Sequence, residues 1–345
     1  LIIKDQWASH PSTEDRVEAL DTLGITKEKV NNGPANTLFK NVEKIQQDIT
    51  DRLFAGVVYE SGATLFKIDE FQHAFVADFQ NNDFDGAYNA YYDSRNTVFL
   101  DVETLKNKEN TTTFEHLFNN EKVDQVYEYV ALENDIQVLE GIAKKAYDIK
   151  TFDYEGIKYK VNEAESLIPK LQTSLEKLSE SIAENDRAIF VFFHSLAQKH
   201  GKEDVLLEKY RLYFEYDKDY DRRYKIYFDL AKALEFVNVT TPFEQISHNF
   251  TQIRPLEVRL KQELQSLFKN PWFVKEINPD TRTNFDNYLS QDWVYFKADA
   301  YEEDVLAMLF AANNDYRYLI NRAYFLMKKD LLAFQITLVT EKANG

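Results

Sequence analysis

The chain has 345 residues, of which 44% are hydrophobic, so it can bury a large core in one elongated domain or in two. Its 58 acidic and 41 basic residues give a formal net charge of −17, which is the wrong sign for a general nucleic-acid or anionic-membrane binder. The absence of cysteine excludes disulfides and thiolate metal sites. No apolar run approaches the ~18–20 residues of a membrane span, so we expect no span in this chain.

The first predicted element is a helix that begins at Ser12 or Thr13. A hydroxyl cap, acidic residues in the first turn and apolar spacing up to Leu20 are typical of a helix start. Capping accounts for the residues from Pro11 onward. It gives no reason for His10, or for Arg16 six residues later.

The segment Ser9–Leu20 reads small residue, His, Pro, x, Thr, x, x, Arg, aliphatic, x, x, Leu. This pattern resembles the downstream motif of HtpX-like and CaaX-prenyl-protease-type membrane zinc metallopeptidases, and the resemblance covers about the first 50 residues. It implies that His10 lies near a zinc cleft and that Arg16 helps to hold this segment in place without binding the metal itself. By the same resemblance, the zinc of the parent enzyme is held by a His-Glu-x-x-His helix and a later Glu.

The chain itself lacks such a zinc site. Its six histidines are His10, His73, His116, His194, His200 and His248; none is followed by Glu and no two are four residues apart. A mononuclear hydrolytic site needs three protein ligands and a carboxylate that activates the bound water. We therefore expect no metal and no cofactor in this chain, with zinc confined to the missing N-terminal peptidase domain.

Along the chain we expect three regions: 1–24 as the tail of a peptidase domain, 25–106 as a helical segment, and 114–345 as a helical accessory domain. Polar or proline-bearing breaks at 107–113, 199–202, 238–242 and 270–280 separate the helical stretches. Alternation around Gly156 predicts one small β-hairpin near 152–161.

Apolar residues three and four apart recur over 129–146, 161–182 and 206–234 and predict three long helices. The cluster at 188–193 predicts a buried helix segment. The tyrosines between Tyr210 and Phe228 could form a stacking platform for single-stranded nucleic acid, but their heptad spacing favours a buried stripe. The expected fold class is mainly α, with long antiparallel helices in a bundle or coiled-coil-like arrangement.

Two functions fit this sequence. In the first, it is the non-catalytic C-terminal region of a membrane-associated zinc metalloendopeptidase, which receives substrate, shields the cleft or mediates assembly. Its partners are then a protein or peptide substrate and the peptidase domain, and it is a soluble region of a bacterial membrane protein, cytoplasmic rather than periplasmic. In the second, it is a free-standing acidic helical scaffold that binds proteins, and the His-Pro segment is only a helix cap.

Overall fold

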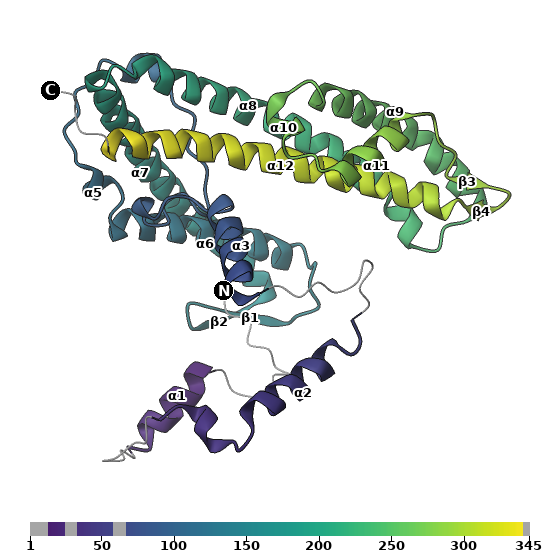
Figure 1. Cartoon of the computed structure of the whole chain (residues 1–345), viewed down its shortest axis with the longest axis horizontal. Helices are drawn as coiled ribbons and strands as arrows, with labels where there is room; N and C mark the ends of the chain where they lie inside the picture. Colours follow the sequence, from purple (N-terminus) through teal and green to yellow (C-terminus); the bar gives the residue numbers. More distant parts are fainter. Residues whose placement is uncertain (1–12, 25–32, 58–66, 341–345) are drawn as a thin grey trace. The chain divides into compact units, whose positions relative to one another are not determined.

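The computed structural model describes residues 13–24, 33–57 and 67–340. Contacts between residues divide the chain into two units. The first unit holds Leu1–Asn82 with Val138–Leu167, and the second holds Asp83–Gln137 with Ile168–Gly345. Nearly all regular structure in the described ranges is helical, which confirms the predicted mainly α class (Figure 1). The three functional regions predicted from the sequence remain predictions.

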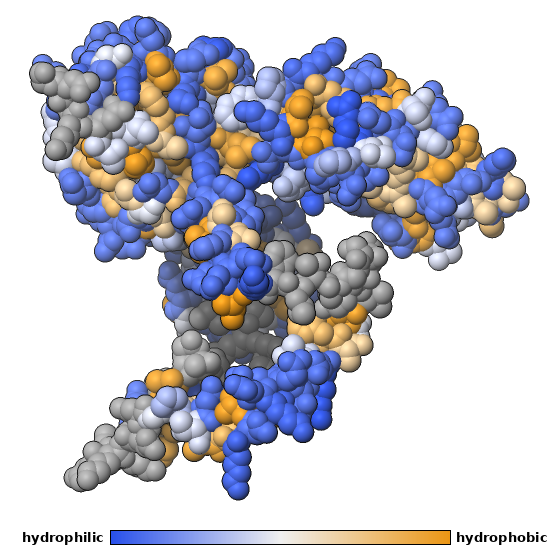
Figure 2. Space-filling view, viewed as in Figure 1, coloured by the Kyte–Doolittle hydropathy of each residue, from blue (hydrophilic) through white to orange (hydrophobic). Residues whose placement is uncertain are grey.

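The first unit begins with three amphipathic helices, α1 (Thr13–Thr22), α2 (Val42–Phe54) and α3 (Ile68–Asn81), and the one-turn helix η1 (Ala35–Leu38). In α3, Phe71, Phe75 and Phe79 are four residues apart, so the rings lie on one face of the helix. All three rings are more than half exposed. Figure 2 shows apolar surface on these helices among the hydrophilic residues.

The predicted hairpin is confirmed. Strands β1 (Thr151–Tyr154) and β2 (Ile157–Lys160) pair antiparallel with Thr151 opposite Lys160. The two turn residues have positive φ, 49° at Glu155 and 76° at Gly156, as the tight hairpin turn requires. The rings of Phe152 and Tyr159 stack across the strands at 5.6 Å.

Helices α6 (Asn120–Ala143) and α7 (Ala164–Lys199) each contribute residues to both units. In the second unit, α7 buries Ile182, Ile189, Phe190 and Phe193, which confirms the predicted buried segment. Gly201, with φ of 65°, forms the turn that leads into α8 (Glu203–Ala233). The predicted long helices are therefore present at the predicted places.

The centre of the second unit is the pair formed by α8 and α12 (Glu303–Thr340), which lie side by side (Figure 1). Their hydrogen bonds set the direction. Gln335 Nε2 donates to Tyr210 Oη at 2.8 Å, Tyr216 Oη to the Ile320 carbonyl at 2.8 Å, and Tyr316 Oη to the Arg223 carbonyl at 3.1 Å. The partners on α12 lie nearer its first residue as α8 proceeds toward its last residue, so the two helices are antiparallel, in keeping with the predicted arrangement. Helix α12 itself lies outside the three stretches predicted as long helices.

The tyrosine stripe of α8 is buried only in its first half. Tyr210, Tyr213 and Tyr216 are almost fully buried, whereas Tyr220 is half-buried and Tyr224 is 37% exposed. The predicted buried stripe is therefore confirmed for Tyr210, Tyr213 and Tyr216 only.

Helix α9 (Phe243–Leu267) packs on α8, and two Asn-Pro breaks start the next helices. Asn270 caps α10 (Pro271–Val274) and Asn278 caps α11 (Pro279–Leu289), each through its side-chain oxygen, with proline at the first helical position. A second, two-residue ladder of β3 (Phe296–Lys297) and β4 (Ala300–Tyr301) was not predicted.

The remaining short helices are η2 (Gly86–Tyr88), α4 (Val102–Leu105), α5 (Phe114–Leu117), η3 (Val161–Glu163) and η4 (Glu235–Asn238). In the portion of the chain that the structure describes, no helix has the length and apolar character needed to cross a membrane.

Candidate functional site

The two residues taken from the peptidase resemblance are not brought together by the described structure. His10 lies outside the described residues. Arg16 lies on α1 with an exposed side chain, and within the described ranges it makes no hydrogen bond or ion pair. Their proposed relation to a zinc cleft therefore stays a prediction.

Metal ligands do not converge either. Among residues 13–24, 33–57 and 67–340, no three His, Asp or Glu side chains are grouped so that they could hold a metal ion. Buried His194 illustrates a structural use: its Nε2 lies 2.7 Å from Glu203 Oε1 and its ring stacks on Phe190 at 5.4 Å. The resemblance assigns the zinc to the preceding peptidase domain, and that assignment stays a prediction.

Asp186 of α7 is a buried carboxylate within a network of hydrogen bonds. It is fully buried and accepts hydrogen bonds from Arg95 Nη1 at 2.8 Å, the Val98 backbone N–H at 2.9 Å and Tyr91 Oη at 3.2 Å. Arg95 Nη2 also contacts Asp186, so the ion pair is bidentate. The pair joins the irregular segment 83–100 to the helices of the second unit, which is a structural role.

Lys328 of α12 also forms hydrogen bonds with the segment 83–100. Its Nζ donates to the backbone carbonyls of Tyr92 and Arg95, both at 2.6 Å, and lies 4.4 Å from the centre of the Phe84 ring. Burial, followed by the nearby Arg95 charge, lowers the pKa of Lys328 to about 7. The sequence carried a signal for the burial of Lys328. Helical spacing puts it on the same face of α12 as Tyr324, four residues before it, and Leu332, four residues after it.

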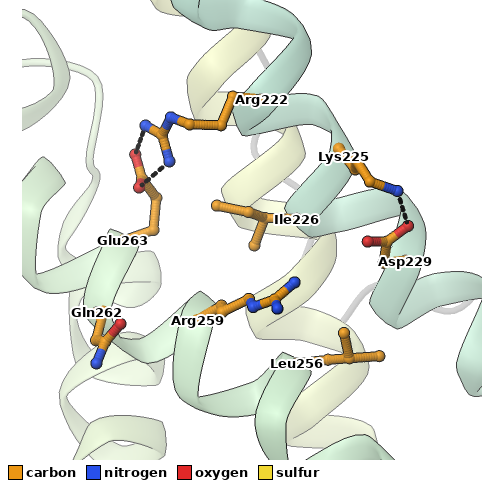
Figure 3. A pocket seen from close by; sticks show the side chains of 8 residues that line it. All are labelled: Arg222, Lys225, Ile226, Asp229, Leu256, Arg259, Gln262 and Glu263. Atoms are coloured by element: carbon orange, nitrogen blue, oxygen red, sulfur yellow. Dashed lines mark hydrogen bonds and ion pairs between the residues drawn. The ribbon is translucent and has the colours of Figure 1, made fainter.

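A cavity of about 350 Å³ lies between α8 and α9 (Figure 3). Its lining comes from one face of each helix: Arg222, Lys225, Ile226 and Asp229 from α8, and Leu256, Arg259, Gln262 and Glu263 from α9. Residues three and four apart on each helix meet here, so two local faces build one site. Sequence reasoning missed it because no single segment contains it.

Most charges of this cavity are paired. Arg222 Nη1 donates to Glu263 Oε2 at 3.1 Å, and Lys225 Nζ donates to Asp229 Oδ1 at 2.7 Å. Arg259 is the exception, since within the described chain its guanidinium has no hydrogen bond or ion pair. In Figure 3 it lies between the two ion pairs.

The ion pairs on the α8 side are reinforced from outside the cavity. Arg223 Nη1 and Arg222 both contact Glu263, and Asp219 accepts from both arginines. The hydrogen bond from Arg222 lowers the pKa of the Asp219 carboxyl. These ion pairs occupy the other charges of the lining, so the exposed Arg259 is the one basic side chain there that has no hydrogen bond or ion pair in the described structure.

A second cavity of about 350 Å³ lies between α7 and residues 105–112. Its lining mixes both charge signs and threonines, and it includes the hydroxyl of Thr112, which is buried without a hydrogen-bond partner in the described structure. Leu105, Ala188 and Val191 give it apolar lining as well, but within the described structure none of its charged side chains forms an ion pair, unlike those of the α8–α9 cavity.

No family model, no curated protein and no solved structure matches this chain.

Proposed function

We propose that this chain is the non-catalytic C-terminal region of a membrane-associated, zinc-dependent metalloendopeptidase, on the cytoplasmic side of a bacterial membrane. Its helices then receive substrate, shield the cleft or mediate assembly, and the catalytic zinc belongs to a peptidase domain that precedes His10. The observation that carries the proposal is the set of exposed apolar side chains on α1, which contains most of the motif that resembles the peptidases, and on α2 and α3, which follow it in the chain.

The faces of these helices carry large apolar side chains that are exposed. The exposed apolar side chains are Val17, Leu20 and Leu23 in and just after α1, Ile45, Ile49 and Leu53 in α2, and Ile68, Phe71, Phe75, Val76 and Phe79 in α3. Amphipathic helices draw most of their stability from burying such a face. Contiguous exposed apolar surface on a soluble protein marks a contact surface. The peptidase domain is the occupant that the adjacent motif favours.

A free-standing scaffold that binds other proteins through the same faces is the alternative. The reading frame upstream of Leu1 separates the two. A His-Glu-x-x-His helix and a hydrophobic span there support the peptidase, whereas a start codon directly before Leu1 leaves only the scaffold.

The decisive experiment uses the full polypeptide. His10→Ala is expected to lower cleavage of an unfolded protein substrate while leaving the melting temperature unchanged, because the role proposed for His10 is beside the metal and not in packing. Unchanged turnover would remove the proposed place of His10 beside the metal.

The proposed cover over α3 is tested in the same polypeptide by hydrogen exchange. Phe75→Ser is expected to speed exchange across α3, because it weakens burial of the apolar face. His73→Ser, two residues before Phe75 and therefore off the apolar face, is also exposed; it is the matched control and should leave exchange unchanged. Fast exchange in the unaltered full polypeptide contradicts a covered α3.

A further inference from the structure

We propose that the cavity between α8 and α9 binds a carboxylate that carries an apolar side chain, the chemistry of the C-terminal residue of a peptide. The inference goes beyond the proposed function and does not depend on it, because every lining residue belongs to the second unit.

Charge selects the ligand class. Three basic and two acidic side chains line the cavity, so in a chain with a net charge of −17 this site carries a local charge of +1. The unpaired positive charge is that of Arg259, because Arg222 and Lys225 form ion pairs with the carboxylates of Glu263 and Asp229. A planar guanidinium matches a carboxylate with two parallel hydrogen bonds.

The same walls disfavour a more highly charged anion. Glu263 and Asp229 would lie beside any ligand that contacts Arg259, and a phosphate dianion would be repelled by both. A carboxylate brings one negative charge against an excess of one positive charge. The exposed Gln262 amide can supply a further donor at the rim.

The apolar residues of the lining indicate what the rest of the ligand is. Ile226 and Leu256 line the cavity from opposite helices, and both are half-buried. A cavity of about 350 Å³ lies at the small end of ligand sites and suits one or two residues of a peptide. An apolar side chain beside the carboxylate would cover both aliphatic residues and gain from their burial.

The test uses the whole chain and fluorescently labelled tetrapeptides ending in leucine, one with a free carboxylate and one with a C-terminal amide. The free acid is expected to bind at least about tenfold more tightly, the usual effect of one charge-assisted hydrogen-bond pair. Arg259→Gln should weaken the acid about ten- to hundredfold. Arg211→Gln, on an exposed arginine of α8 outside the cavity, should leave it unchanged.

Two further arms test the apolar part and the source of the carboxylate. Leu256→Ala should reduce the preference for a leucine-ended over a glycine-ended peptide. The second arm uses unlabelled 4-methylpentanoate to displace the labelled peptide. If it displaces the peptide as well as the unlabelled peptide acid does, the site binds small apolar acids of the same chemistry. If it displaces the peptide only weakly, the site binds peptide ends.

The proposal is overturned by equal binding of acid and amide, by no binding of either, or by an unaffected Arg259→Gln variant. Binding of inorganic phosphate without binding of the leucine-ended acid also overturns it, because the apolar residues of the lining would then have no part. Circular dichroism of each variant confirms that the fold is retained.

Discussion

The buried amine of Lys328 makes the stability of the second unit depend on pH in a direction that can be measured. Burial first, and Arg95 second, lower the pKa of Lys328 from 10.5 to about 7. The side chain is only 6% exposed, so solvent screening is slight. A neutral amine still has two N–H donors for the two carbonyls that it contacts.

The sign follows from proton counting. Between pH 7 and 10.5 the unfolded chain holds the lysine proton and the folded chain does not, so raising the pH favours folding. One proton of difference gives a slope of about 1.4 kcal/mol per pH unit; because the folded-state lysine is half titrated at pH 7, the rise from pH 7 to pH 9 is roughly 2 kcal/mol. Below pH 7 the lysine is charged in both states and its contribution is constant.

The assay is urea denaturation followed by circular dichroism at pH 7, 8 and 9, for the unaltered chain and for Lys328→Met. The variant should lack the Lys328 part of the slope, whereas Lys232→Met, on an exposed lysine of α8, should keep it. Groups that titrate in all three proteins cancel in the comparison. A Lys328→Met slope equal to that of the unaltered chain would refute the assigned ionisation.

Two further predictions concern the ion pairs and zinc. Asp186→Asn leaves the Arg95 guanidinium, 7% exposed, without its counter-charge and should lower the free energy of unfolding by about 3–5 kcal/mol in urea denaturation. Asp330→Asn breaks a pair with Lys209 that is partly open to solvent and should cost less than about 1 kcal/mol; a similar loss in both variants argues against the special role of Asp186. The purified chain, dialysed against zinc and then buffer, should retain well below one zinc per chain by elemental analysis, and one tightly held ion per chain contradicts the expectation that the ligands lie elsewhere.

The sequence determined the local elements because their causes are local. Helical hydrogen bonds join residues four apart, so the apolar spacing over 206–234 was enough to place α8. The turn at Glu155 and Gly156 and the Asn-Pro helix starts at Asn270 and Asn278 follow from the backbone preferences of a few neighbouring residues.

Only the tertiary structure decided which partners the buried charges meet and where a ligand can enter. Arg95 and Asp186 are 91 residues apart, and Lys328 contacts the carbonyl of Tyr92 across 236 residues, distances over which no residue spacing carries a signal. The α8–α9 cavity likewise needs Arg222 and Arg259 from two helices, and the availability of Arg259 depends on which neighbours pair elsewhere. The periodicity of the sequence determines which face of a helix is apolar. Tertiary packing determines which element covers that face and which charged side chains beside it stay without an ion-pair partner.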